Sequence, residues 1–193
     1  CSSDLNITFF DSDGKWLNNI LLPVHIPYAL TVWRKIDADY TPIDWQLDVK
    51  SGYRWDNKKW FTCQQIGEKL GADIKVPWEL ARMQHFPQLA VFAIILEDKR
   101  DRLIKEFKNQ VLDFICTNPV RMGVNWKCTM DVAIRCVNML VAYDLFKQMD
   151  GKHILDQAFH EIFSKSVYEH GRFIVEHLEW SEFLTSNHYL SNV

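Results

Sequence analysis

The stretch 97-EDKRDRLIKEFKNQVLDFICTNP-119 gives the clearest structural signal in this sequence. Its apolar residues recur at intervals of three or four, which places them in one stripe along an α-helix. They are Leu103, Phe107, Val111 and Phe114. The acidic residues at its start favour the positive end of a helix dipole, and the Asn118-Pro119 pair marks its end. The stretch therefore predicts an amphipathic helix with one buried face.

A second helical pattern precedes this one. Pro77 suits the first turn of a helix, and 78-WELARMQHF-86 follows it. Pro87 predicts a kink or a break, because proline has no backbone N–H to donate. The very apolar piece 88-QLAVFAIIL-96 continues the pattern.

Two further helices are expected downstream, over about 125–149 and about 154–178. The predicted buried face of the first consists of Met130, Ala133, Val137, Leu140 and Val141. That of the second consists of Leu155, Phe159, Ile162, Phe173 and His177. Gly171 is expected to mark a kink or a close helix contact. Because the connecting loops are short, sequential helices should pack antiparallel.

Residues 1–60 lack this periodicity. The segment 37-DADYTPIDWQLDVKSGYRW-55 combines Pro, Gly, Asp and aromatic residues, and we expect it to be irregular and to wrap a surface. The predicted organisation is an irregular N-terminal segment over 1–60, packed on a helical domain over 61–193.

The composition indicates a globular chain that can bury a sizeable core, with 48% hydrophobic and 24% charged residues. A net charge of −3 gives no basic field for nucleic acid, although a local cationic cleft is compatible with it. No apolar run approaches the length of a membrane span. The eight Trp and twelve Phe indicate either a bulky core or a cleft that stacks on flat ligands such as sugar rings.

Cysteine spacing favours buried thiols over a metal site, because no CxxC pair is present. The residues concerned are Cys63, Cys116, Cys128 and Cys136. Cys1, which Ser2 and Ser3 follow, is compatible with the mature end of a lipoprotein or with an arbitrary start of the sequence.

Three longer stretches go beyond periodicity. They are 73-DIKVPWELARMQHFPQLA-90, 118-NPVRMGVNWKCTMDVAIRCVNMLVAYDLF-146 and 170-HGRFIVEHLEWSEFLTSNHYLSN-192. Together, and in this order, they resemble the N-terminal helical domain of the heparinase II/III-like polysaccharide lyases, a family that includes alginate lyases. The stretch 42-PIDWQLDVKSGYRW-55 is similar to the one that precedes them in the family.

The resemblance implies an all-α fold, an incomplete α/α toroid of antiparallel helical hairpins over residues 61–193. A β-sandwich follows in the family, so we expect the natural protein to be longer than this chain. The resemblance also implies a cleft for an acidic polysaccharide and a β-elimination beside a uronate. It implies neither a cofactor nor a metal.

This elimination removes a proton from the carbon beside a carboxylate, so the enzyme must neutralise that carboxylate as negative charge develops. An Asn amide and a His ring are suitable donors, and Asn187 and His188 match the family's Asn-His pair. The alternative is that Asn187 caps a helix and His188 lies on the surface. The family's proton-transferring Tyr belongs to a motif expected beyond Val193. Tyr189 is expected to pack or to form part of the cleft wall.

Weaker substrate-binding candidates lie in the WELARMQH motif and before the third helix. Arg82, Gln84 and His85 could meet a substrate carboxylate or sulfate. Glu79, three residues before Arg82, could instead pair with it. Asn125 and Trp126 are candidates for the cleft wall, where Trp126 either stacks on a sugar ring or packs in the core.

Other polar residues of the helices have structural interpretations. Asp131 and Arg135, four residues apart, are expected to form a local ion pair. His160, His170 and His177 are expected at ordinary helix positions rather than in a metal site.

Two other functions stay open at this point. One is a non-catalytic glycan-binding or scaffold domain with the same fold. The other is an α/α-toroid glycoside hydrolase, which needs two carboxylates across a cleft. The available carboxylates are Glu79, Asp131, Glu179 and Glu182. A periplasmic or exported bacterial location follows from the resemblance alone, and the glycan and the oligomeric state stay open.

Overall fold

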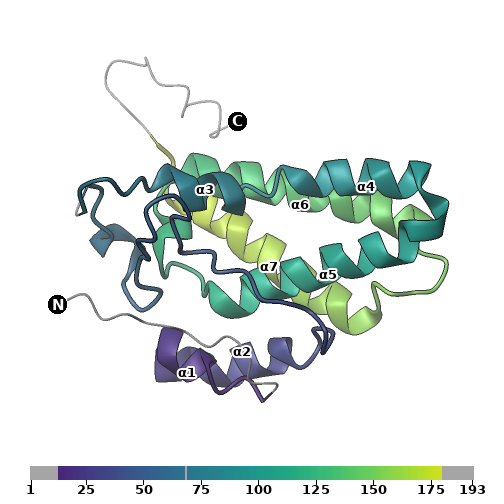
Figure 1. Cartoon of the computed structure of the whole chain (residues 1–193), viewed down its shortest axis with the longest axis horizontal. Coiled ribbons are helices and arrows are strands. Elements are labelled where there is room, and N and C mark those ends of the chain that lie inside the picture. Colours follow the sequence, from purple (N-terminus) through teal and green to yellow (C-terminus); the bar gives the residue numbers. More distant parts are fainter. Residues whose placement is uncertain (1–12, 68, 180–193) are drawn as a thin grey trace.

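The computed structural model describes residues 13–67 and 69–179 of the chain (Figure 1). Over these ranges it contains helices and two isolated β-bridges but no β-strand, so the all-α prediction is confirmed. The α-helices are α1 (Leu17–Ile20), α2 (Ile26–Trp33), α3 (Lys75–Ala81), α4 (His85–Ile95), α5 (Arg100–Thr117), α6 (Thr129–Met149) and α7 (Gln157–Glu176). Short 3-10 helices are η1 (Pro23–His25), η2 (Phe61–Cys63), η3 (Glu97–Lys99) and η4 (Val124–Trp126).

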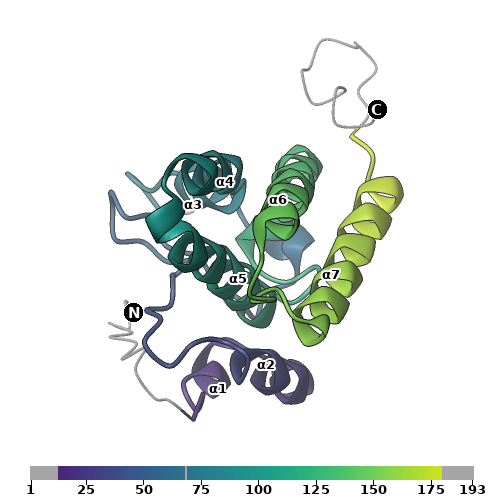
Figure 2. The ribbon, with the colours of Figure 1, turned by 90° about the vertical axis from the view of Figure 1, so that its right-hand side faces the viewer.

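Helices α4 to α7 form two antiparallel hairpins, α4–α5 and α6–α7, that lie side by side (Figure 2). Helix α4 packs against α5 and α6, and α7 packs against the same two helices. This arrangement is the one expected of an incomplete α/α toroid, in which successive hairpins stack against each other.

Each of the four long helices contributes a phenylalanine to the centre of the core. Phe107 of α5 lies with its ring centroid 5.0 Å from that of Phe86 of α4 and 4.9 Å from that of Phe146 of α6. Phe159 of α7 completes the group at 6.1 Å from Phe107. All four side chains are buried, so these aromatic residues form part of the hydrophobic core and not of a ligand-binding cleft.

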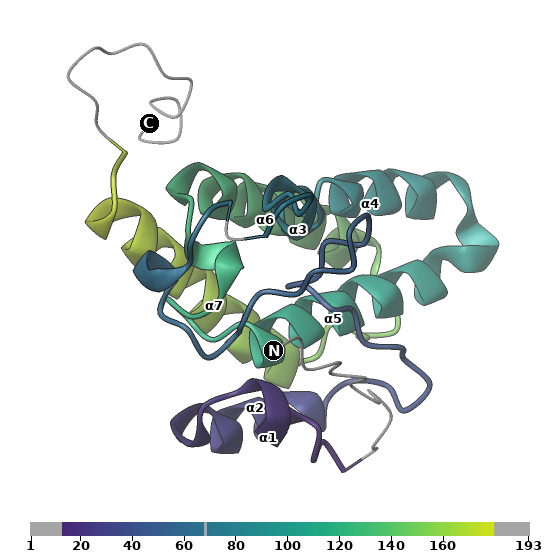
Figure 3. The same cartoon turned by 60° about the vertical axis from the view of Figure 1, so that its left-hand side comes forward.

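The N-terminal part is more helical than expected. Residues 17–33 contain α1 and α2, and α2 packs against α5 as a separate layer (Figure 3). Ala29 and Val32 face this contact and are buried. The segment that follows α2 is irregular, as expected, with a 3-10 turn at Phe61–Cys63 as its first regular element.

The helix break in the WELARMQH motif lies at residues 82–84 and not at Pro87, which corrects the prediction. Met83 adopts a φ of 55°, which ends α3 and turns the chain into α4. Pro87 lies in the first turn of α4, where a missing N–H removes no helical hydrogen bond. The amide of Asn138 secures the turn by donating to the Arg82 carbonyl at 2.8 Å.

The predicted buried face of α6 is wrong. Val137, Leu140 and Val141 are exposed, whereas Val132, Met139, Ala142 and Phe146 are buried. The inner face also buries Asp131 and Arg135, which a pattern based on hydrophobicity assigns to the surface.

The predicted buried faces of α5 and α7 agree better with the structure. The stripe on α5 is confirmed for Phe107, Val111 and Phe114, which are buried. On α7, Phe159 and Phe173 are buried as predicted. A side chain at Gly171 would meet nothing within 4 Å, so this glycine marks no close helix contact.

Candidate functional site

The WELARMQH motif lies at the junction of α3 and α4, and its polar residues diverge from one another. Arg82 lies against α6, where its Nε donates to Asp131 Oδ1 at 2.5 Å. Its Nη1 donates to Glu79 Oε1 at 2.5 Å, so the predicted Glu79–Arg82 pair is confirmed. Burial works to lower the pKa of Arg82, but the hydrogen bond and charge of Asp131, with Glu79, raise it overall. Arg82 therefore stays charged while it joins two helices.

His85 lies against α5 instead. Its Nε2 is 2.7 Å from Gln110 Oε1, and Gln110 Nε2 donates to Glu106 Oε1 at 2.6 Å. Because the Gln110 amide nitrogen already donates to a carboxylate, its oxygen faces His85, and His85 Nε2 must carry a proton. Gln84 is exposed between the two. The structure thus does not bring Arg82 and His85 to one point.

Asn125 and Trp126 do not form an exposed cleft wall, which corrects that prediction. Each is 1% exposed, and Trp126 packs with centroids 4.7 Å from His170 and 5.1 Å from Phe173. Asn125 donates to the Trp45 carbonyl at 2.7 Å. Both residues hold the loop before α6 in the core, and Trp126 also contributes to the wall of a pocket described below.

Arg135 is fully buried and does not form the predicted ion pair with Asp131, whose carboxylate pairs with Arg82. Its Nε donates to His170 Nε2 at 3.0 Å, and its guanidinium lies 4.6 Å from the centroid of the Phe114 ring. Burial lowers the pKa of Arg135 to about 9. Burial and the Arg135 charge together lower the pKa of His170 to about 3, so this histidine is neutral. Its Nδ1–H then donates to the Ser166 carbonyl at 2.7 Å.

The first turn of α6 is capped from the far end of the chain. The Glu179 carboxylate accepts hydrogen bonds from Thr129 N at 2.7 Å and Met130 N at 3.4 Å. The Thr129 hydroxyl donates to the His177 carbonyl at 2.7 Å. A carboxylate is stabilised at a helix N-terminus by the unpaired amides and the helix dipole. The end of α7 is therefore fixed beside Arg82 and Asp131.

The predicted catalytic residues lie just beyond this point. Asn187, His188 and Tyr189 fall outside the described residues, as does Glu182. Their assignment stays a prediction.

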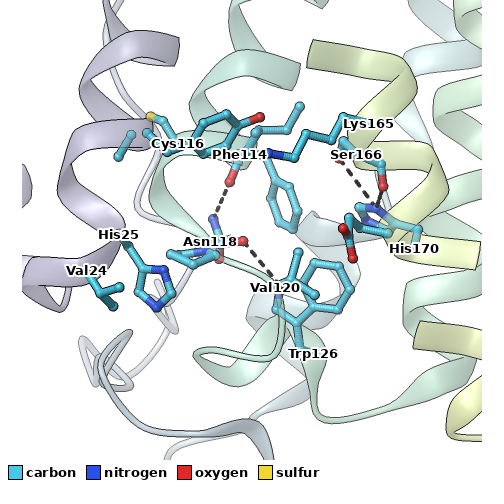
Figure 4. A pocket seen from close by; sticks show the side chains of 15 residues that line it. Val24, His25, Phe114, Cys116, Asn118, Val120, Trp126, Lys165, Ser166 and His170 are labelled. Carbon is cyan, nitrogen blue, oxygen red and sulfur yellow. Dashed lines mark hydrogen bonds between the residues drawn. The ribbon is translucent and has the colours of Figure 1, made fainter. Parts of the chain in front are cut away.

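A pocket of about 320 Å³ lies between α2, the end of α5 and α7 (Figure 4). Its floor includes Asn118 and His170, whose polar atoms are already hydrogen-bonded within the protein. At its rim, Lys165 Nζ lies 4.1 Å from the centroid of the Tyr28 ring. Its walls come from separate segments of the chain, so the sequence pattern did not bring them together, although Trp126, a candidate for a cleft wall, is one of its lining residues.

The described cysteines are free thiols, and most of them are buried. Cys116, Cys128 and Cys136 are buried free thiols, whereas Cys63 is exposed, contrary to expectation. Within residues 13–67 and 69–179, no cluster of His, Cys, Asp or Glu side chains is arranged to hold a metal ion. None of the described helices combines the length and the apolar character needed to cross a bilayer.

The fold defines a class of helical domains built from antiparallel hairpins. The family model described as the heparinase II/III N-terminus matches residues 5–192, so the chain belongs to this family. The recognition made from the three sequence stretches is thereby confirmed. Neither the curated proteins nor the solved structures contain a match to this chain.

Proposed function

We propose that the protein carrying this chain is a polysaccharide lyase that cleaves uronic-acid-containing glycans by β-elimination. The observation that carries the proposal is the match of the heparinase II/III N-terminus family to residues 5–192. In this proposal, Asn187 and His188 hydrogen-bond the uronate carboxylate as its neighbouring carbon loses a proton.

Asn187 and His188 follow Glu179 in the chain, and Glu179 caps the first turn of α6, where Asp131 pairs with Arg82. Their role rests on the match of the sequence motif to the family.

Proton transfer is assigned to a Tyr that the family resemblance places after the Asn-His pair. No motif of that kind occurs within these residues. We therefore expect this chain alone to bind substrate weakly and to turn it over slowly or not at all.

The hydrolase alternative has less support. Glu79 and Asp131 both pair with Arg82, and Glu179 caps α6. A hydrolase needs one carboxyl group protonated and another free to activate water. These three carboxylates are instead engaged in structural contacts.

The test is ultraviolet absorbance of the unsaturated uronate product. The full-length protein is incubated with alginate, heparan sulfate, chondroitin sulfate and bacterial capsular polymers, beside Asn187→Ala and His188→Ala variants. Absorbance that rises with the wild type and is lost in both variants supports the proposal. A folded wild-type protein that binds a glycan without forming this product would favour a non-catalytic binding domain.

A further inference from the structure

Trp60 is a solvent-exposed tryptophan at the end of the bundle where α6 begins. It is 43% exposed, whereas the other tryptophans of the described ranges are buried or partly buried. Those residues are Trp16, Trp33, Trp45, Trp55, Trp78 and Trp126. An exposed indole does not contribute the stabilisation that a buried one provides. A functional role would explain why a tryptophan occupies this exposed position.

The backbone around Trp60 is held firmly. Trp60 and Met122 form an antiparallel β-bridge, and Phe61 N donates to the Arg121 carbonyl at 2.8 Å. The next residue, Phe61, is buried with its ring centroid 5.2 Å from Phe173 of α7. Trp60 is therefore presented on an ordered backbone, which lowers the entropy lost when a ligand binds.

Positive charge gathers around this position. Arg121 and Arg172 share one carboxylate, that of Glu176, so two cations face one anion. Lys127 Nζ donates to the Thr62 carbonyl at 3.2 Å and forms no ion pair with a carboxylate in the described part of the chain. The surface is thus locally cationic on a chain whose net charge is −3.

Two acids also lie near this surface, and both keep their negative charge while they accept hydrogen bonds from backbone amides. Asp56 accepts a hydrogen bond from the Lys58 amide at 2.8 Å. Glu179 caps the first turn of α6. Lys58, which is two residues from Trp60, adds a fourth cation, so cations outnumber the three carboxylates named here, those of Glu176, Asp56 and Glu179.

We propose that Trp60, Arg121, Lys127 and Arg172, named here the Trp60 surface, bind an anionic polysaccharide. The indole of Trp60 stacks on the apolar face of a sugar ring. Lys127 and the two arginines pair with the carboxylates or sulfates of neighbouring sugars. Charge complementarity selects an acidic glycan over a neutral one, because a neutral chain gains nothing from the positive charge that Glu176 alone leaves unbalanced.

The Trp60 surface adjoins the first turn of α6. Lys127 precedes Cys128 and Thr129, and Glu179 docks on Thr129. A glycan bound at Trp60 would thus extend toward the first turn of α6, where Glu179 docks. The inference rests on the proposed function for the identity of the ligand, and it adds the residues that bind the glycan away from the cleaved bond.

The first experiment measures affinity by calorimetry for alginate and heparan sulfate oligosaccharides, and for the alginate oligosaccharides after reduction of their carboxyl groups, which makes them neutral. We expect Trp60→Ala to weaken binding of the anionic forms about three- to tenfold, the range for one aromatic contact. We expect Trp60→Phe to retain part of the affinity. Lys127→Gln should weaken binding about two- to fivefold and make it less sensitive to salt.

Phe92→Ala provides the matched control. Phe92 is an aromatic residue of α4 with 51% exposure, in the part of α4 that leads away from the α3 junction. Its replacement should leave glycan affinity unchanged. Equal affinities for wild type, Trp60→Ala and Lys127→Gln would overturn the inference, as would equal binding of the carboxyl-reduced alginate oligosaccharides.

The two proposals fail in different ways. If the full-length wild type forms unsaturated product and Trp60→Ala has unchanged affinity and KM, the lyase proposal stands and the Trp60 surface is refuted. If no product forms but binding depends on Trp60 and on the glycan charge, the surface stands and the lyase proposal is refuted. A rise in KM with an unchanged kcat in Trp60→Ala would support both.

Discussion

Asp113 of α5 anchors the irregular segment that follows α2. Its Oδ2 accepts hydrogen bonds from Ile43 N at 2.8 Å, the Tyr40 hydroxyl at 3.0 Å and Trp45 Nε1 at 3.2 Å. The carboxyl group is fully buried, and this burial raises its pKa to about 7 although the three donors oppose the shift. One side chain thus joins the segment to the helix core.

The raised pKa predicts how stability depends on pH. Folded Asp113 holds its proton more tightly than the unfolded chain does, so its contribution to stability is full below pH 3.8 and is lost as the pH rises through about 7. We expect Asp113→Asn to remove this fall from the free energy of unfolding, measured by urea titration across that pH range. Asp98→Asn, at an exposed position, is the control. An unchanged slope in Asp113→Asn would contradict the prediction.

Arg82 gives a second test at this scale. Removing its charge by Arg82→Met leaves the buried Asp131 carboxylate without its partner, so we expect a loss of about 3 kcal/mol in the free energy of unfolding. Glu79, whose side chain is 56% exposed, should matter less, and Glu79→Gln should cost at most about 1 kcal/mol. Chemical denaturation of both variants checks the difference. Equal losses would show that the buried pair has no special weight.

At the scale of elements, α6 differs most from its sequence pattern. Its inner face carries Asp131 and Arg135, whose partners come from the α3–α4 junction and from α7. Its outer face carries Val137, Leu140 and Val141. Helix α6 therefore buries charged residues on one face and exposes apolar residues on the other. Hydrophobicity alone does not predict which of its faces packs against the core.

This orientation predicts opposite responses on the two faces of α6. Val141→Lys, at an exposed position, should change the free energy of unfolding by less than about 0.5 kcal/mol. Met139→Ala, at a fully buried position, should cost about 3 kcal/mol through lost contacts and a cavity. Thermal and urea unfolding measure both. A large loss for Val141→Lys would instead support the face predicted from the sequence.

At the scale of the whole molecule, α1 and α2 form a layer that covers α5. Trp16 and Trp33 pack edge to face with centroids 5.3 Å apart, and Val32 is fully buried. Asp37 N then donates to the side chain of Asn109 on α5 at 3.1 Å. The N-terminal layer thus shares the core of the helical hairpins.

Removal of residues 1–36 should therefore uncover an apolar face of α5. We expect the shortened chain to bind a hydrophobic fluorescent dye and to unfold at lower temperature and with less cooperativity than the full chain. Calorimetry and dye fluorescence are the measurements, with Val24→Ser, at an exposed position of η1, as the conservative control. Retention of the full transition would show that the hairpins fold without this layer.

Some residues of the proposed site could be named from the sequence, and others could not. Order along the chain identified the family and nominated Asn187 and His188, whose roles stay predictions. Trp60 was missed because its exposure depends on the bridge to Met122, which lies far along the chain. Trp126 was ambiguous because an aromatic residue at a helix start suits a core or a cleft equally well.

The sequence by itself determined the helical class, the family and the buried stripe of α5, because these depend on local periodicity and on motifs in order. The tertiary structure decided which face of α6 is buried, where the chain turns between α3 and α4, and which of the described tryptophans is exposed. The physical reason is that burial of Asp131 and Arg135 depends on partners distant in the chain. Hydrophobic periodicity contains no information about such partners.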